Sequence, residues 1–290
     1  MGKAIVFDDI TVASPLQTVT FTHGVSGMVR EYLDKLSIDV PEPHAEAFQA
    51  FYVALRNGGV WDKLTCLYPM YGSVSGCAYG LIGDSLTIPT GATYDKGINL
   101  VNATGGFGAD GRGILLMDNF PSSYRTNYSL FVNYPYGWTS AQRGYPFVFA
   151  SDAARTAATS AGRFLGQAYG SENGWLNIRA TLASDNTSQL RCAVEAGTKG
   201  LFGETHTLVQ NNDSHYLYHD GEAIASVIGG YDSVDNMGKL GVNASAQTSQ
   251  VNHCLNVPIN MVIVSNGYAL SAEDVALLNT SVKALVEVIF

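Results

Sequence analysis

His215-Tyr-Leu-Tyr-His219, Asp220-Gly221 and Ala223-Ile-Ala-Ser-Val-Ile228 follow one another in the last third of the chain. Two runs that are rich in aromatic and aliphatic residues flank an Asp-Gly pair. This is the strongest short-range signal of a β-hairpin that a sequence can carry. In the first run, alternation places His215, Leu217 and His219 on one face of the strand. The stretch therefore predicts two antiparallel strands joined by a tight turn.

Two more strands and a terminal helix complete this last third. Lys239-Leu-Gly-Val242 and Asn260-Met-Val-Ile-Val-Ser265 have the composition of strands. Ser271 is followed by acidic residues, which is the pattern of a helix N-terminus, because a serine side chain and nearby carboxylates satisfy the free N–H groups and complement the helix dipole. The helix is predicted to run to Val288. We expect its apolar face to pack against the sandwich or against a helix at Ala45–Asn57.

Upstream of the hairpin, short strand-like runs alternate with turns of Gly, Asn and Ser, and helical periodicity is scarce. The predicted strands there are Cys66–Tyr71, Ile98–Val101, Gly113–Met117, Tyr128–Val132, Phe147–Ala150, Phe164–Ala168, Leu176–Arg179, Gln189–Val194 and Thr205–Gln210. Many short strands in close succession are typical of an antiparallel sandwich. The missing crossover helices exclude a parallel α/β fold. The predicted class is mainly β, an antiparallel β-sandwich with helical additions at both ends.

The first forty residues differ from the rest of the chain. Ala4–Phe7 and Leu16–Phe21 resemble strands, and Val25–Leu36 has apolar residues at helical spacing. A unit of this size cannot bury a sizeable core, so we expect it to dock on the main domain or on another chain. Residues 1–40 are therefore predicted to be an attachment or oligomerisation segment.

The boundary of the main domain is predicted at Pro41-Glu42-Pro43. Two prolines in three residues stop a helix and stiffen a linker. Ala45–Asn57 follows as an amphipathic helix, and Gly58-Gly59 ends it. Residues 41–290 are predicted to form the sandwich domain.

Charge and composition argue against a nucleic-acid partner and against membrane insertion, and they suggest the state of the cysteines. The formal net charge is −9, and the 16 Lys and Arg residues are scattered, so a nucleic-acid partner is not expected. Residues 1–9 carry one Lys and four consecutive apolar residues, too few for a signal peptide or a membrane span. We expect synthesis in the cytoplasm and no membrane insertion. The cysteines, which we expect to be free and mostly buried, are Cys66, Cys77, Cys192 and Cys254.

Several stretches together resemble a group of tailed-bacteriophage virion proteins. They are Asn57-Gly-Gly-Val-Trp-Asp-Lys-Leu64 with Leu67-Tyr-Pro-Met-Tyr71, Gly105-Gly-Phe-Gly-Ala-Asp-Gly111, Leu217-Tyr-His-Asp-Gly-Glu222 and Ala269-Leu-Ser-Ala-Glu-Asp-Val-Ala-Leu-Leu-Asn279. The resemblance covers about residues 44–290. It implies a concanavalin A-like (laminin G-like) jelly roll on a head fibre, a decoration protein or a tail-associated protein. It implies no shared catalytic residues, and residues 1–40 lie outside it.

Three motifs that suggest chemistry have simpler explanations. Gly106-x-Gly108-x-x-Gly111 matches the dinucleotide fingerprint, but Arg112–Met117 after it is a predicted strand and not the helix that the motif requires. His215 and His219, four apart on a strand, are separated by roughly 13 Å, too far to share one metal ion. We interpret them as histidines on the surface of a sheet. No strand carries the alternating carboxylates of a sandwich glycosidase. We therefore expect no catalytic residue, no cofactor and no metal.

Aromatic loops are the remaining candidates for a binding site. Asn133-Tyr-Pro-Tyr-Gly-Trp-Thr139 combines aromatic rings with amide and hydroxyl groups. That composition suits a glycan site, a protein interface or a buried loop anchor. The residues singled out for glycan or protein contact are Tyr134, Tyr136 and Trp138.

These observations lead us to expect a non-enzymatic phage virion protein, a head fibre or decoration protein displayed on the virion surface. Residues 1–40 would attach it to the capsid or to other virion proteins. It would bind other copies of itself, as a trimer by analogy with fibres, and it would bind host or environmental surface polysaccharide. The alternatives are a carbohydrate-active enzyme (a glycoside hydrolase or lyase) on a jelly-roll fold, a tail-associated receptor-binding protein, and a purely structural protein without a ligand.

Overall fold

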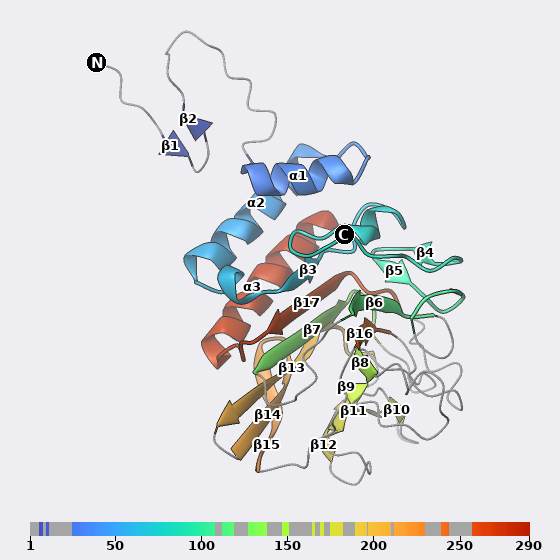
Figure 1. Cartoon of the computed structure of the whole chain (residues 1–290), viewed down its shortest axis with the longest axis vertical. Coiled ribbons are helices and arrows are strands. Elements are labelled where there is room, and N and C mark those ends of the chain that lie inside the picture. Colours follow the sequence, from blue (N-terminus) through green and yellow to red (C-terminus); the bar gives the residue numbers. More distant parts are fainter. Residues whose placement is uncertain are drawn as a thin grey trace.

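Two large antiparallel sheets and a layer of helices form the main body of the chain in its computed structural model (Figure 1). It describes residues 6–7, 10–11, 25–107, 112–118, 127–137, 147–150, 164–165, 169–170, 175–181, 189–195, 197–209, 212–229, 239–243 and 257–290. The predicted strand at Leu16–Phe21 and the residues Trp138 and Cys254 lie outside these ranges.

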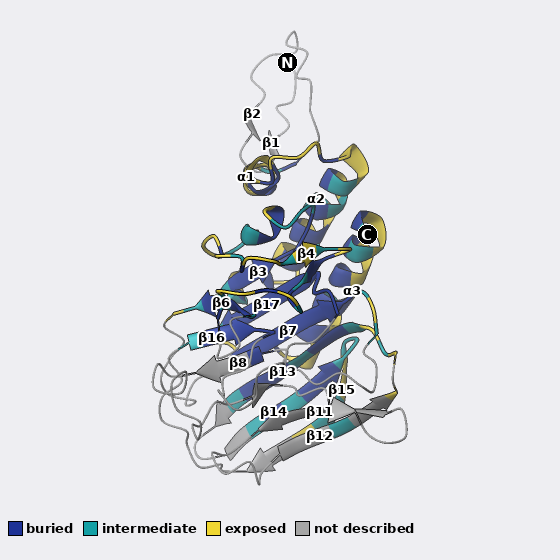
Figure 2. Cartoon of the chain, turned by 90° about the vertical axis from the view of Figure 1, so that its right-hand side faces the viewer, coloured by how far each residue is buried: buried dark blue, intermediate teal, exposed yellow. Residues whose placement is uncertain are grey.

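The six-stranded sheet has the order β15-β14-β13-β7-β17-β3. Its strands are β3 (Cys66–Tyr68), β7 (Tyr128–Tyr134), β13 (Gly200–Val209), β14 (Asn212–His219), β15 (Glu222–Gly229) and β17 (Met261–Asn266). All neighbours are antiparallel, and His206 on β13 pairs with Tyr128 on β7 and with His215 on β14. Figure 2 shows β7 and β17 buried along their length, as expected for central strands that are covered on both faces.

The seven-stranded sheet has the order β10-β11-β9-β8-β16-β6, with β12 paired to β11. Its strands are β6 (Ile114–Met117), β8 (Phe147–Ala150), β9 (Phe164–Leu165), β10 (Tyr169–Gly170), β11 (Trp175–Thr181), β12 (Gln189–Glu195) and β16 (Lys239–Val242). Two further sheets have two strands each: one joins β1 (Val6–Phe7) to β2 (Ile10–Thr11), and the other joins β4 (Thr93–Tyr94) to β5 (Ile98–Asn99).

One hydrophobic core lies between the two large sheets. Leu130, Val132 and Phe202 from the six-stranded sheet share a buried cluster with Ile114 and Val242 from the seven-stranded sheet. Apolar residues from both sheets thus meet face to face, which is the defining feature of a sandwich. The predicted mainly β fold, an antiparallel β-sandwich with a C-terminal helix, is confirmed.

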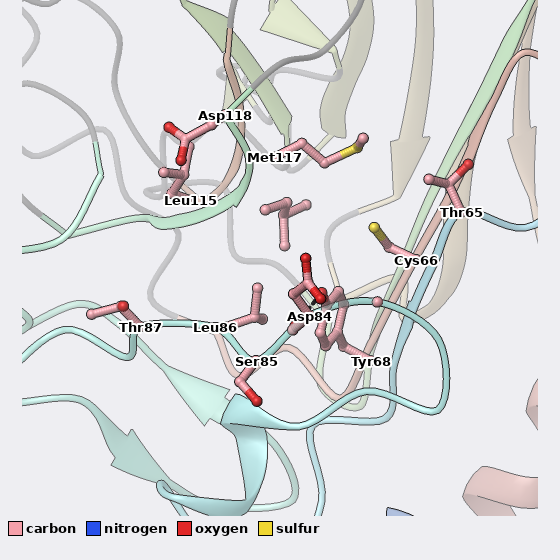
Figure 3. Close-up of a pocket in the computed structure, with 12 residues that line it drawn as sticks. Thr65, Cys66, Tyr68, Asp84, Ser85, Leu86, Thr87, Leu115, Met117 and Asp118 are labelled. Carbon is pink, nitrogen blue, oxygen red and sulfur yellow. Dashed lines mark hydrogen bonds between the residues drawn. The ribbon is translucent and has the colours of Figure 1, made fainter. Parts of the chain in front are cut away.

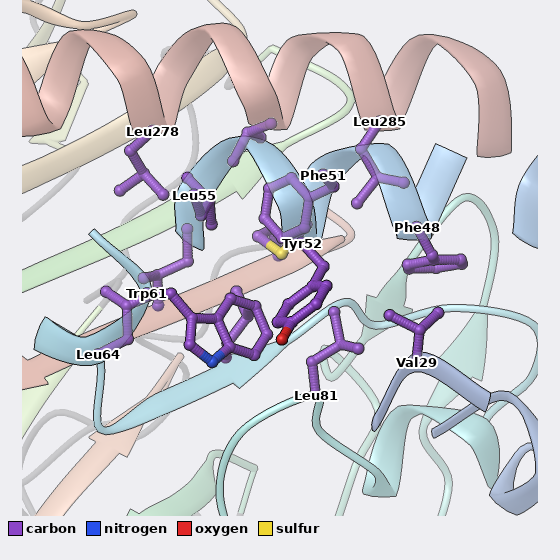
Figure 4. Packing of buried hydrophobic residues seen from close by; sticks show 14 of the residues in the cluster. Val29, Phe48, Phe51, Tyr52, Leu55, Trp61, Leu64, Leu81, Leu278 and Leu285 are labelled. Carbon is purple, nitrogen blue, oxygen red and sulfur yellow. The ribbon is translucent and has the colours of Figure 1, made fainter. Parts of the chain in front are cut away.

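Three helices cover the other face of the six-stranded sheet: α1 (Gly27–Lys35), α2 (Glu42–Asn57) and α3 (Ala272–Ile289). Their buried residues form a second cluster with Phe131, Tyr218 and Ile263 of the sheet. In Figure 4, Phe51, Tyr52 and Leu55 of α2 lie between α3 and the strand below. The short 3₁₀ helix η1 (Trp61–Lys63) adds Trp61, whose ring meets that of Tyr52 edge to face at 4.7 Å. The expected packing of the terminal helix is therefore confirmed.

The hairpin turn and the cap of the terminal helix form as predicted. Asp220 and Gly221 have φ angles of 52° and 87°, the left-handed values that a tight two-residue turn requires. The Ser271 side chain accepts the backbone N–H of Asp274, and the Asp274 side chain accepts that of Ser271, so the two make a capping box. The Asp220-Gly221 turn and the Ser271 cap therefore both form at the residues predicted from the sequence.

The predicted linker at Pro41–Pro43 is wrong. α2 begins at Glu42, with Pro43 in its first turn. Proline is tolerated there because the first N–H groups of a helix have no partner inside the helix. The helix predicted at Val25–Leu36 is confirmed as α1. Its Val29 and Tyr32 belong to the same buried cluster as Phe48 of α2, so this part of the N-terminal segment docks on the main domain. The division of the chain at residue 41 stays a prediction.

Candidate functional site

A pocket of about 480 Å³ lies at one side of the sandwich. It opens where β3 ends the six-stranded sheet and β6 ends the path of the seven-stranded sheet. Figure 3 shows its two walls, the segment 83–87 on one side and the segment 115–118 on the other. Thr65, Cys66 and Tyr68 complete the lining. The pocket is therefore built from segments that are far apart in the sequence and that meet only because both sheets end here.

The floor of the pocket is apolar and its rim is polar. Leu86 and Leu116 belong to the core between the sheets. Tyr68 Oη donates a hydrogen bond of 2.8 Å to the backbone carbonyl of Asp84, which holds the 83–87 segment against the sheet. The exposed side chains at the rim carry hydroxyl and carboxylate groups; they are Asp84, Ser85, Thr87 and Asp118. The pocket thus offers hydrogen-bonding groups around an apolar surface.

Cys66 and Tyr68 in the pocket wall stay neutral near pH 7. Burial raises the pKa of the Cys66 thiol to about 11, and the nearby Asp84 carboxylate adds to the shift while a hydrogen bond with Tyr68 opposes it. Burial also raises the pKa of Tyr68 well above its ordinary value, again with contributions from Cys66 and Asp84. A thiol must ionise to act as a nucleophile, so Cys66 contributes no nucleophile at neutral pH.

The three aromatic residues singled out from the sequence do not form one surface. Tyr134 is the last residue of β7 and is fully buried, with its ring 6.2 Å from that of Phe202. It is a core residue, which corrects the prediction that it contacts a glycan or a protein. Tyr136 is exposed, and its Oη donates to Asp95 Oδ2 at 3.3 Å. Trp138 lies outside the described residues.

His215 is not a surface residue, so that interpretation is wrong for it; the His219 side chain is 22% exposed, and its Nε2 lies 2.9 Å from the Lys199 carbonyl oxygen. His206 and His215 are almost completely buried, and their rings lie 4.3 Å apart. Tyr128 Oη donates to Glu204 Oε1 at 2.7 Å, and His215 Nδ1 lies 3.9 Å from the same oxygen. The alternation was assigned correctly, because His215 shares a face with Leu217, but that face is turned toward the second sheet. Within the described ranges, no group of three or more His, Cys, Asp or Glu is arranged to hold a metal ion.

The structure also shows what surrounds the glycine-rich stretch and the cysteines. Phe107 and Gly113 form an antiparallel bridge and β6 follows directly, so the glycine-rich stretch leads into a strand and not into a nucleotide-binding helix. Cys66 and Cys77 are free and buried, as predicted, and Cys192 is half-buried. None of the helices in the described part of the chain has the length and hydrophobicity that a bilayer crossing needs.

Sequence analysis missed the rim residues Asp84, Ser85, Thr87 and Asp118. Gly83-Asp84-Ser85 between apolar residues signals a turn, but a turn motif does not say what faces it. β3 is an end strand of one sheet and β6 is an end strand of the other. Residues 83–87 and 115–118 form one pocket because these two ends lie side by side, which only the three-dimensional structure shows.

No protein-family model matches the chain, and no curated protein matches it by sequence. Similar solved structures include domain 4 of the GH43 extracellular arabinanase AbnA of Geobacillus stearothermophilus, at 12% identity and a TM-score of 0.47, over 75% of this chain and 98% of that one. The sialidase of Trypanosoma rangeli has 9% identity and a TM-score of 0.49, over 77% of this chain and 33% of the sialidase. At these identities and TM-scores, the ligands and reactions of the similar proteins cannot be assigned to this chain.

Proposed function

We propose that this chain is a non-enzymatic carbohydrate-binding domain whose binding site is the pocket between β3 and β6. The observation that carries the proposal is the composition of that pocket. Exposed hydroxyls and carboxylates from Ser85, Thr87, Asp84 and Asp118 surround an apolar floor in a space of about 480 Å³. This volume lies within the range of roughly 300–1,000 Å³ that is usual for small-ligand sites.

Sugars require this combination of groups. Their hydroxyls need several donors and acceptors at fixed positions, and the C–H faces of their rings gain from contact with apolar surface. The 83–87 segment is held in place by the bond from Tyr68 to Asp84 and by the bond from Leu86 N–H to the Ala78 carbonyl, 2.8 Å each. A rim that is held before binding loses less entropy when a ligand binds.

The setting that we propose is the surface of a phage particle, as a head fibre or decoration protein. The resemblance of residues 44–290 to tailed-phage virion proteins supports this part of the proposal. A single shallow site would bind a sugar weakly, and many copies on one particle would raise the overall affinity through avidity. A virion protein of this kind needs no catalytic group, and the neutral Cys66 thiol in the pocket wall fits that role.

A glycan array probed with the full chain tests the carbohydrate-binding function. We expect at least one class of glycan to bind, and incubation of that glycan with the protein to leave its length unchanged. Thr87→Trp places a large ring in the rim and should abolish binding, whereas Thr280→Trp on the exposed face of α3 should not. A blank array would overturn the proposal, and shortened products would replace it with an enzymatic function.

The virion setting has a separate test. Sequencing of the genes beside the coding gene should find capsid, portal and tail proteins, and antibodies against this chain should label intact particles. Neighbouring genes of central metabolism, with no labelling of particles, would refute the setting without touching the binding site.

A further inference from the structure

Negative charge stands on both walls of the pocket. Asp84 lies in the segment 83–87, and Asp118 follows β6 on the opposite wall (Figure 3). Both residues are exposed at the rim. Lys239 Nζ lies 3.5 Å from Asp118 Oδ1 and compensates part of that charge, but the Asp118 side chain is still 66% exposed. A ligand in the pocket would therefore lie between two carboxylates.

The Asp84 carboxylate interacts electrostatically with the side chains of Cys66 and Tyr68 in the pocket wall. After burial, which is the main cause, this carboxylate is one of the groups that raise the pKa of Cys66 and Tyr68. Ionisation of either residue would place a second negative charge beside Asp84. An anionic group on a ligand at this position would meet the same repulsion, and a cationic group would meet attraction.

We propose that the pocket selects sugars that carry a protonated amine, such as 2-amino-2-deoxyhexoses, over neutral sugars, and that it binds sugars that carry a carboxylate more weakly than neutral sugars. This inference rests on the proposed carbohydrate-binding function. The pocket defines the site, with its hydroxyls and apolar floor, and the carboxylates on its two walls define which sugars it prefers.

The size of the preference follows from Coulomb's law. Two unit charges about 4 Å apart in a water-like medium interact by roughly 1 kcal/mol, which corresponds to about a fivefold change in affinity. Asp84 should supply most of this preference, because Lys239 partly neutralises Asp118. Since the rim is exposed, salt should weaken the preference as it screens the charges.

The experiment compares three matched probes on the full chain. They are the β1,4-linked trimers of glucosamine, glucose and glucuronic acid, which differ mainly in the presence of an amine or a carboxylate. Isothermal titration at about pH 6, below the pKa of an ordinary amino group (~7.7–8.0), keeps the sugar amine protonated. We expect the glucosamine trimer to bind about fivefold more tightly than the glucose trimer at low salt, and the glucuronic acid trimer to bind about fivefold more weakly than the glucose trimer.

Substitutions test which carboxylate causes the preference for the glucosamine trimer over the glucose trimer. Asp84→Asn should bring the ratio of glucosamine to glucose affinity close to one, and Asp118→Asn should lower that ratio less. Both side chains are exposed, so the variants should fold. Asp39→Asn makes the same change of charge at an exposed position away from the pocket and is the control. A fivefold advantage that persists in Asp84→Asn would overturn the assignment.

The failure of this inference can be told from the failure of the proposed function. If the glucosamine trimer binds no more tightly than the glucose trimer, or if neither binds, the selectivity proposal is wrong. The carbohydrate-binding function falls only when the glycan array is blank as well. Tight binding of the glucuronic acid trimer would leave the function intact and refute the selectivity.

Discussion

Lys63 Nζ lies 2.8 Å from Oδ1 and 2.7 Å from Oδ2 of Asp274, across 211 positions of sequence. The same carboxylate accepts the backbone N–H of Ser271 at 3.0 Å and so belongs to the capping box of α3. Asp274 therefore connects the start of the last helix to η1, the segment that leads into β3. The helical layer is fixed to the sheet at this point by charge as well as by apolar contact.

This pair predicts a pH-dependent stability. Burial opposes ionisation of Asp274, but hydrogen bonds from Lys63 and from the Ser271 N–H outweigh it and hold the pKa of the carboxyl below its ordinary value. A carboxyl whose pKa is lower in the folded than in the unfolded chain stabilises the fold above the unfolded pKa, about 3.9 for Asp, and this contribution is lost as the pH falls through the folded pKa.

We therefore expect Asp274→Asn to lower the free energy of unfolding at pH 7 and to differ less from the wild type as the pH falls below about 4. Urea unfolding at several pH values measures both quantities. Asp62→Asn, on the exposed side of η1, is the control and should show no such convergence. A constant difference at all pH values would mean that the ion pair contributes nothing.

The turn of the β14–β15 hairpin also contacts α3, through a hydrogen bond and an ion pair to Asp220. Asn279 Nδ2 donates to the backbone carbonyl of Asp220 at 2.7 Å, and Lys283 Nζ lies 2.8 Å from Asp220 Oδ2. Asn279→Ala leaves that carbonyl without its donor, and we expect a loss of about 1–3 kcal/mol in the free energy of unfolding. Thr280→Ala, one residue further along and exposed, should cost less than about 0.5 kcal/mol. Equal effects of the two substitutions would refute this role of Asn279.

The elements that sequence predicted best are those with strong local chemistry. The Asp220-Gly221 turn needs left-handed backbone, and the Ser271 cap needs free N–H groups, so a few residues determine each feature. β8 and β16 also form at their predicted residues, Phe147–Ala150 and Lys239–Val242. The turn and the cap depend on groups within a few residues, whereas β8 and β16 pair with each other far apart in the sequence and were predicted from their composition alone.

The errors share a cause, which is that the partner lies far away in the sequence. The face of β14 that carries His215 was assigned to solvent because histidine is polar, and only the second sheet makes it an interior face. Tyr134 was assigned to a loop, but β7 continues to that residue because Gly200 of β13 pairs with it. The pocket between β3 and β6 depends on sheet order, which no local pattern encodes.

The contrast between Tyr134 and Tyr136 gives a third prediction. Tyr134→Ala removes a fully buried ring from the core and should destabilise the fold by about 3 kcal/mol or more. Tyr136→Ala removes an exposed ring and should change the free energy of unfolding by less than about 0.5 kcal/mol. Thermal melts distinguish the two. If Tyr136→Ala also weakens binding of the array glycan while its melting temperature is unchanged, the loop takes part in recognition.

Helix α1 contributes aromatic contacts that matter for any truncation. The ring of Tyr32 meets that of Phe48 edge to face at 5.3 Å, and Phe48 meets Tyr71 at 5.4 Å. Tyr32 Oη donates to the carbonyl of Pro69 at 3.3 Å, and Gln49 Oε1 accepts the N–H of Ser26 at 2.7 Å. Residues from 25 onward are therefore part of the helical layer.

Two truncations separate attachment from folding. Removal of residues 1–24 leaves α1 and its contacts in place, so we expect a melting temperature close to that of the full chain and, if the segment attaches the protein to particles, loss of incorporation. Removal of residues 1–40 exposes Phe48 and Tyr71, and the lost burial of Val29, Tyr32, Leu33 and Leu36 costs roughly 1.5–3 kcal/mol for each large side chain. Circular dichroism melts and particle co-sedimentation measure the two effects. Normal incorporation of the 25–290 chain would refute attachment through its first residues, and equal stability of both truncated chains would refute the role of α1 in the core.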